Sequence, residues 1–183
     1  MDAGRWYGPY QNFLSANRIY AMESQINIAY IDAANLDRAV RDLGWKLDYK
    51  KFRVWLSDKY KIERAYIFIG LIPTYKDLYT YFQESGFTLI FKEVVYQGTG
   101  VPKGNCDTDL IMQAIDDAYE GHLRKALLVS SDGDYAPLVK KLQKREQFLG
   151  ILSPAPAKKC SILLKRTDAR IAYLHDQKNH LQA

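Results

Sequence analysis

The chain has 183 residues, the size of one ordinary globular domain, and it can bury a core without disulfides or a structural metal. Hydrophobic residues make up 48% and charged residues 26% of the sequence, which excludes a disordered or fibrous protein. The net charge is +5, a surplus that permits a polyanionic partner without requiring one.

Cysteine usage and the apolar runs indicate where the protein acts. The two cysteines, Cys106 and Cys160, cannot build a disulfide framework and do not have the spacing of a zinc site. The first residues lack the basic-then-apolar order of a secretory signal, and the longest apolar stretch, 65–73, is too short to span a bilayer. We therefore expect a cytoplasmic protein that does not bind to a membrane.

Strand and helix patterns alternate along most of the chain. In order, the predicted elements are a strand at 26–31, a helix from about 35 to near 44, a helix at 49–59, a strand at 65–69, a helix at 76–84, a strand at 87–91, a glycine-rich loop at 98–104, a helix at 107–119, a strand at 126–130, a helix at 135–145 and a strand at 148–152. This alternation predicts an α/β protein with a parallel sheet covered by helices on both faces.

The same pattern predicts the domain organisation. Residues 25–175 carry the alternation and are expected to form one domain. Residues 1–24 lie outside it, and their many aromatic residues predict a helical extension packed on that domain. Residues 176–183 are expected to form a C-terminal tail.

Aspartates gather where the predicted strands end. Asp32 follows the first strand, and Asp132 and Asp134 follow the fourth. Asp107 and Asp109 open the helix that precedes the fourth strand. Ligands of an open parallel sheet bind beyond the carboxyl ends of its strands. Three separated segments are therefore expected to bring carboxylates to one edge.

Converging carboxylates repel one another unless a cation lies between them. Mg²⁺ and Mn²⁺ suit such a site because they take oxygen ligands and keep some bound water. A metal held in this way can activate a water and stabilise charge on a phosphodiester, which favours a metal-dependent nuclease. Any single aspartate could instead be a helix N-cap, but one helix needs one cap, so capping explains the two aspartate pairs poorly.

Three segments resemble the signatures of a known family: IAYIDAAN at 28–35, KGNCD at 103–107 and LVSSDGDY at 128–135. In this order and spacing, across about 25–175, the chain resembles the NYN domain, in the LabA-like branch of the PIN-like nuclease superfamily. The resemblance implies a Rossmann-like three-layer α/β/α sandwich with a mainly parallel sheet. It also implies a ribonuclease site that depends on Mg²⁺ or Mn²⁺.

The resemblance assigns roles position by position. Four aspartates match the catalytic, metal-binding acids of the family: Asp32, Asp107, Asp132 and Asp134. Asn35 and Ser130 match the polar residues beside them, and Lys103 matches a lysine of the family; we expect all three to bind substrate.

The chain departs from the family pattern at two positions. Gln113 stands where the family often has a further aspartate, and Asp109 or Asp116 could compensate as a metal ligand. Ser131 stands where a glycine is usual.

Basic residues after the last predicted strand extend the expected substrate site. Lys158 and Lys159 follow that strand on the edge where the acids lie, and we expect them to bind RNA phosphates. Other helix-surface lysines are interpreted as a solvated face. Tyr135 could stack a base, although a packing role is the favoured interpretation.

The sequence therefore predicts an endoribonuclease that hydrolyses single-stranded RNA with a metal-activated water, since an unpaired strand can enter a cleft that excludes a duplex. A second hypothesis is a non-catalytic RNA- or protein-binding module on the same fold, which Gln113 favours. A phosphatase is more remote because it requires Asp-x-Asp after the first strand, and Asp32 is followed by two alanines. A homo-oligomer is left open.

Overall fold

The structure is a computed structural model that describes residues 25–92, 95–96, 102–103 and 106–183. The expected helical extension at 1–24 and most of the expected loop at 98–104 lie outside the described residues. Within the described part of the chain, no helix is long and apolar enough to cross a membrane.

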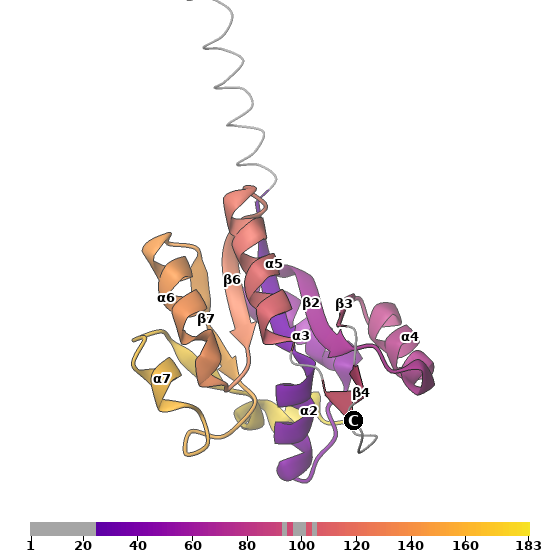
Figure 1. The fold of residues 1–183 in the computed structure, drawn as a ribbon. Coiled ribbons are helices and arrows are strands. Elements are labelled where there is room, and N and C mark those ends of the chain that lie inside the picture. The colour runs from indigo at the N-terminus through magenta and orange to yellow at the C-terminus, as the bar shows by residue number, and fades with distance from the viewer. Residues whose placement is uncertain (1–24, 93–94, 97–101, 104–105) are drawn as a thin grey trace, which may run out of the picture.

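A six-stranded sheet occupies the centre of the fold, and every neighbouring pair of strands is parallel (Figure 1). In spatial order its strands are β3 (Thr88–Lys92), β2 (Ile62–Gly70), β1 (Ile26–Asp32), β6 (Leu123–Val129), β7 (Phe148–Ser153) and β8 (Ile171–Tyr173). All six strands therefore end at one edge of the sheet, the carboxyl edge.

Helices cover both faces of this sheet (Figure 1). One face packs against α2 (Ala33–Asp42) and α3 (Tyr49–Tyr60). The other packs against α5 (Asp107–Tyr119), α6 (Ala136–Lys144) and α7 (Ile162–Lys165). The helix α4 (Lys76–Glu84) lies beside β3. Short helical turns complete the fold: η1 (Pro73–Tyr75), η2 (Gly133–Tyr135), η3 (Leu174–Gln177) and α8 (Lys178–Leu181).

The two cores are built from alternate residues of the same strands. In β1, Ala29 and Ile31 enter the core under α2 and α3, while Ile28 and Tyr30 enter the core under α5 and α6. Successive strand residues point to opposite faces, so an uninterrupted apolar strand can supply both cores. Each such side chain, when fully buried, contributes about 1.5–3 kcal/mol. The three-layer α/β/α sandwich with a parallel sheet is confirmed.

The structure corrects the sequence interpretation in three places. Pro102–Lys103 was expected in a loop but forms β5, an antiparallel partner of β4 (Val95–Tyr96). The strand β8 was not predicted because three residues are too short to show an alternating pattern. The predicted helix at 135–145 begins only at Ala136, because residues 133–135 form the turn η2.

The C-terminal residues are structured. Residues 176–183, expected as a tail, contain the end of η3 and the helix α8. Leu181 is buried in the core under α3, and Gln182 pairs with Leu47. These contacts tie the end of the chain to the start of α3.

Candidate active site

Asp32 ends β1 at the carboxyl edge and caps α2. Its Oδ1 accepts a hydrogen bond from the backbone N–H of Asn35 at 3.0 Å. Its Oδ2 accepts from the hydroxyls of Ser130 at 3.4 Å and Tyr135 at 3.2 Å. The side chain is nearly enclosed, and burial raises the pKa of this carboxyl above its ordinary value. Asp32 is therefore held by protein groups on both of its oxygens.

Tyr135 connects two of the predicted acids. Its ring is fully buried, and its hydroxyl lies 3.2 Å from Asp32 and 2.5 Å from Asp107. Burial raises the pKa of this phenol, so the hydroxyl keeps its proton. A hydroxyl has one proton and can donate it fully to only one carboxylate. The single Tyr135 proton is therefore shared between the Asp32 and Asp107 carboxylates.

Three aspartates, one of them bonded to Tyr135, lie close together, and we call them the acidic group. Each of Asp107, Asp132 and Asp134 offers a carboxylate oxygen within 4.8 Å of the other two. Asp107 comes from the first turn of α5, whereas Asp132 and Asp134 flank Gly133 in η2. Such hard oxygen donors fit Mg²⁺ or Mn²⁺, with water completing the coordination. The residues present therefore fit the metal that the sequence predicts.

Local hydrogen bonds and packing fix the loop that carries two of these acids. The backbone N–H of Asp134 donates to Asp132 Oδ1 at 3.0 Å, and that of Asp132 donates to Ser130 Oγ at 3.1 Å. Gly133 lies against the start of α7, where an added Cβ would collide with Ser161 Oγ and press on Leu163. Only glycine leaves room for α7 at this position.

Asn35 joins α2 to the same loop. Its Oδ1 accepts from the backbone N–H of Ser131 at 2.9 Å and from the Ser131 hydroxyl at 2.7 Å. Because a backbone N–H can only donate, these bonds identify the oxygen of the amide. The Asn35 NH₂ group has no hydrogen-bond partner in the described ranges, and Asn35 lines the cleft beside the acidic group. Its NH₂ group is therefore available to a ligand.

Asp109, Asp116 and Gln113 all lie outside the acidic group. Asp109 forms an ion pair with Lys92 at 2.9 Å and is not a member of the acidic group. Asp116 is exposed farther along α5 and is also outside the group. Gln113 donates to the buried Asp117 at 3.2 Å, and Tyr30 donates to the same carboxylate at 2.8 Å. Gln113 therefore belongs to a buried network between α5 and β1.

The predicted substrate lysines occupy different places. Lys103 lies in β5, and its side chain is outside the described part of the structure. Lys158 is exposed after β7. Lys159 pairs with Asp42 at 3.4 Å, at the far end of α2, about 15 Å along the helix axis from Asp32. Lys159 therefore lies well away from the acidic group.

A cleft of about 720 Å³ opens beside the acids. Asp32, Asp107 and Asp132 line one end of it, and α2 forms one wall with Arg38 and Arg41. Other lining residues come from the end of β2, η1 and α4 and include Ile72, Tyr75 and Leu78. Cys106 also lines the cleft, but burial raises the pKa of its thiol to about 11, so it stays protonated. A cysteine nucleophile is not supported.

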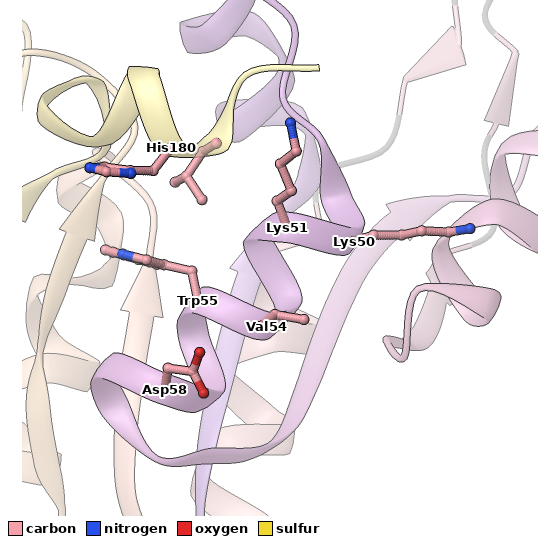
Figure 2. Close-up of a pocket in the computed structure, with 7 residues that line it drawn as sticks. Lys50, Lys51, Val54, Trp55, Asp58 and His180 are labelled. Carbon is pink, nitrogen blue, oxygen red and sulfur yellow. The ribbon is translucent and has the colours of Figure 1, made fainter.

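A second groove, of about 400 Å³, lies on α3 and α8 (Figure 2). Val54, Trp55 and Asp58 come from α3, and His180 comes from α8 (Figure 2). Asp58 is the single carboxylate among its described lining residues, so this groove has no counterpart of the acidic group.

Sequence reasoning missed three features of the site. The Tyr135 ring is buried and cannot stack a base, so that alternative is wrong, and its hydroxyl instead bonds two acids. Arg38 and Tyr75 were not singled out, although both line the cleft. No local pattern in the sequence marks any of these roles, because each depends on which elements pack side by side.

The fold and the acids define the class of protein: a parallel α/β sandwich with a carboxylate group suited to a divalent metal at its carboxyl edge. The family model of the NYN domain matches residues 27–174, and the chain belongs to this family. A crystal structure of a protein of unknown function from Vibrio parahaemolyticus has the same fold, with a TM-score of 0.67 and 20% identity over 87% of this chain and 98% of that one. No curated protein sequence matches the chain.

Proposed function

We propose that this protein is an endoribonuclease of the LabA-like branch that hydrolyses single-stranded RNA with Mg²⁺ or Mn²⁺. One observation carries the proposal: on an NYN fold, three carboxylates from two segments far apart in sequence lie within 4.8 Å of one another at the carboxyl edge. Carboxylates this close repel one another, and a divalent cation bound between them relieves that repulsion. PIN-like nucleases, the superfamily to which the family points, typically depend on divalent metals.

The acids divide into two roles in this proposal. Asp107, Asp132 and Asp134 hold the metal directly or through water. A bound divalent cation supplies Lewis-acid chemistry, activating a water and neutralising charge on the scissile phosphate. Asp32 is a positioning residue in this proposal and does not contact the metal. It orients Asp107 through the Tyr135 hydroxyl, and it caps the first turn of α2. Asp109 keeps its ion pair with Lys92.

Polar and basic residues bind and orient the RNA. The free NH₂ group of Asn35 donates to a phosphate oxygen, and Ser130 fixes both Asp32 and the backbone of Asp132. Lys103 and Lys158 supply positive charge along the strand, and Lys159 is a more distant contact of the same kind. Cys106 is unsuitable as a nucleophile because burial raises its thiol pKa, so activation of water would fall to a metal held by Asp107, Asp132 and Asp134.

A second candidate function is a non-catalytic RNA-binding module. Gln113 favours it, because this residue replaces a further acid of the family pattern and its side chain is hydrogen-bonded to Asp117.

Free thiols at Cys106 and Cys160 support a reducing compartment, and we propose a cytoplasmic location for either function.

Cleavage of a labelled single-stranded oligoribonucleotide distinguishes the two. We expect internal cuts with Mn²⁺ or Mg²⁺, none with a chelator, and none from Asp132→Asn, which removes a metal ligand. Asp109→Asn is the control and is expected to cut normally, because Asp109 lies in the same helix turn as Asp107 but outside the acidic group. RNA that binds but is never cut with either metal would establish the binding module instead.

A further inference from the structure

Exposed apolar side chains gather beside the acidic group. Four large hydrophobic residues near the carboxyl ends of β2 and β3 are each between 39% and 49% exposed: Leu71, Tyr75, Leu78 and Phe91. Tyr75 and Leu78 belong to the wall of the cleft itself. Exposed apolar groups concentrated at a cleft mark a surface that contacts a ligand.

The part of the cleft that α2 forms carries positive charge. Arg38 and Arg41 lie on α2. Arg41 is paired with Asp37 at 3.2 Å, whereas Arg38 has no ion-pair partner among the residues that the structure describes. Arg38 follows Asp32 by six residues, which places it about 9 Å along the helix axis from that acid. A cation without an ion-pair partner among the described residues therefore lines the same cleft as Asp32, Asp107 and Asp132.

One part of the cleft is cationic and the other is apolar and aromatic, and the two sides of a single nucleic-acid strand differ in a matching way. A single strand presents phosphates on one side and unpaired base faces on the other, and proteins bind it with cations and with aromatic rings. A duplex buries those faces in its own stack and cannot present them to a side chain. An apolar peptide would match the Tyr75 wall but would leave Arg38 without a partner.

We propose that this cleft is a nucleotide subsite, in which Tyr75 stacks on one unpaired base while Arg38 contacts a phosphate flanking the scissile one. The inference deepens the proposed function, because it rests on RNA being the ligand of the acidic edge. The subsite makes the enzyme require an unstacked nucleotide next to the cut. The acidic group repels phosphate when no metal is bound, and Arg38 offsets part of that repulsion.

The test measures binding of three probes with Mg²⁺ present: a single-stranded oligoribonucleotide, the same length of abasic ribose phosphate, and an RNA duplex. All proteins carry Asp132→Asn so that the probes stay intact. We expect Tyr75→Ala to weaken binding of the single strand about tenfold and to leave the abasic strand and the duplex unchanged, since stacking on one base is lost. Tyr75→Phe keeps the ring and is expected to restore binding.

Tyr119→Ala is the matched control for the ring. Tyr119 is 59% exposed at the end of α5, which starts at the carboxyl edge with Asp107 and runs away from it. We expect no change in binding of any probe. Tyr75→Ala should leave the melting temperature near that of the parent because the ring is exposed, whereas Tyr119→Ala should lower it slightly by removing cation–π contacts with Arg145 and Lys141.

Arg38→Ala tests the other wall. We expect weaker binding of the single strand and of the abasic strand alike, with the slope of log affinity against log salt reduced by about one. Arg38→Lys should restore the slope. Arg124, exposed near the start of β6 at the opposite edge of the sheet, provides the control Arg124→Ala, which should leave the slope unchanged.

Equal losses on the single strand and the abasic strand after Tyr75→Ala would overturn the subsite, as would no loss on either. If RNA is cut but Tyr75→Ala leaves binding unchanged, the subsite fails and the proposed function stands. If the base-dependent loss is found but the protein with Asp132 restored never cuts RNA with Mn²⁺ or Mg²⁺, the subsite stands and the nuclease proposal fails. Failure of the parent to bind any of the probes would overturn both.

Discussion

The side-chain oxygen of Asn35 accepts two hydrogen bonds from Ser131, one from its backbone N–H and one from its hydroxyl. These bonds tie the first turn of α2 to the loop that carries Asp132 and Asp134. Because the oxygen of the Asn35 amide faces Ser131, its NH₂ group points away from Ser131. A serine at position 131 thus gains a partner that a glycine would have only through its backbone.

Replacement of Asn35 separates its structural role from its substrate role. Asn35→Ala leaves the partly buried N–H of Ser131 without an acceptor, so we expect the free energy of unfolding to fall by about 1–3 kcal/mol. We expect RNA cleavage to be lost as well. Asn35→Asp keeps both acceptor positions but has no NH₂ donor. We expect lower stability than the parent without metal, because a further carboxylate joins the acids, and strongly reduced cleavage, measured by thermal melts and by initial rates. Full activity of Asn35→Asp would show that the NH₂ group is not used.

The raised pKa of Asp32 makes stability depend on pH. Because the folded-state pKa lies above the ordinary value of 3.8, the folded protein binds more protons than the unfolded chain between those two values. The stabilisation from protonated Asp32 is fully present below 3.8 and is lost as pH rises through the raised pKa. Asp32→Asn cannot ionise and should not show this loss.

Thermal melts of the metal-free protein and of Asp32→Asn across the acidic to neutral range provide the measurement. The difference between the two curves isolates Asp32 from the other carboxylates. We expect Asp32→Asn to gain stability relative to the parent as pH rises, since it relieves a buried charge. A difference that does not change with pH would contradict a raised pKa.

Divalent metal should stabilise the folded protein in a concentration-dependent way. Binding to the folded state alone contributes about 2.7 kcal/mol at a metal concentration one hundred times the Kd. We expect Mn²⁺ to raise the melting temperature of the parent and of Asp109→Asn equally, and to have little effect on Asp132→Asn or Asp107→Asn. A shift that survives in both of the latter variants would place the metal elsewhere.

Gly133 should tolerate no side chain. In Gly133→Ala the new Cβ meets Ser161 and Leu163, and we expect a loss of about 1–3 kcal/mol of stability from overpacking. Cleavage should fall further than stability explains, because Asp132 and Asp134 move with the loop. Adding Ser161→Gly removes the closest clash and should recover part of both losses, as followed by melts and initial rates. Unchanged activity in Gly133→Ala would mean that the loop can shift without moving the acids.

Much of the fold follows from local patterns. The strands β1 and β6 each contain an apolar run, 28–31 and 126–129, and α4 and α5 have the bounds that their amphipathic pattern predicts. The carboxyl ends of parallel strands share one edge, so the sequence predicts that Asp32 and Asp132 approach each other without any knowledge of side-chain contacts. Alternation was least informative for β8, whose three residues form a strand only because β7 offers an edge.

The sequence by itself determined which elements form and which acids reach the carboxyl edge, because helix and strand periods and the direction of parallel strands are local properties. Only the tertiary structure decided how those acids are used. Packing of η2 against α5 placed the Tyr135 hydroxyl between Asp32 and Asp107, and the position of β3 gave Lys92 to Asp109. The cleft between Arg38 and Tyr75 likewise joins α2 to η1, segments that meet only after the sheet forms. Such partners are far apart in the chain, and the energy that selects them comes from burial and hydrogen bonding across elements, which no local pattern records.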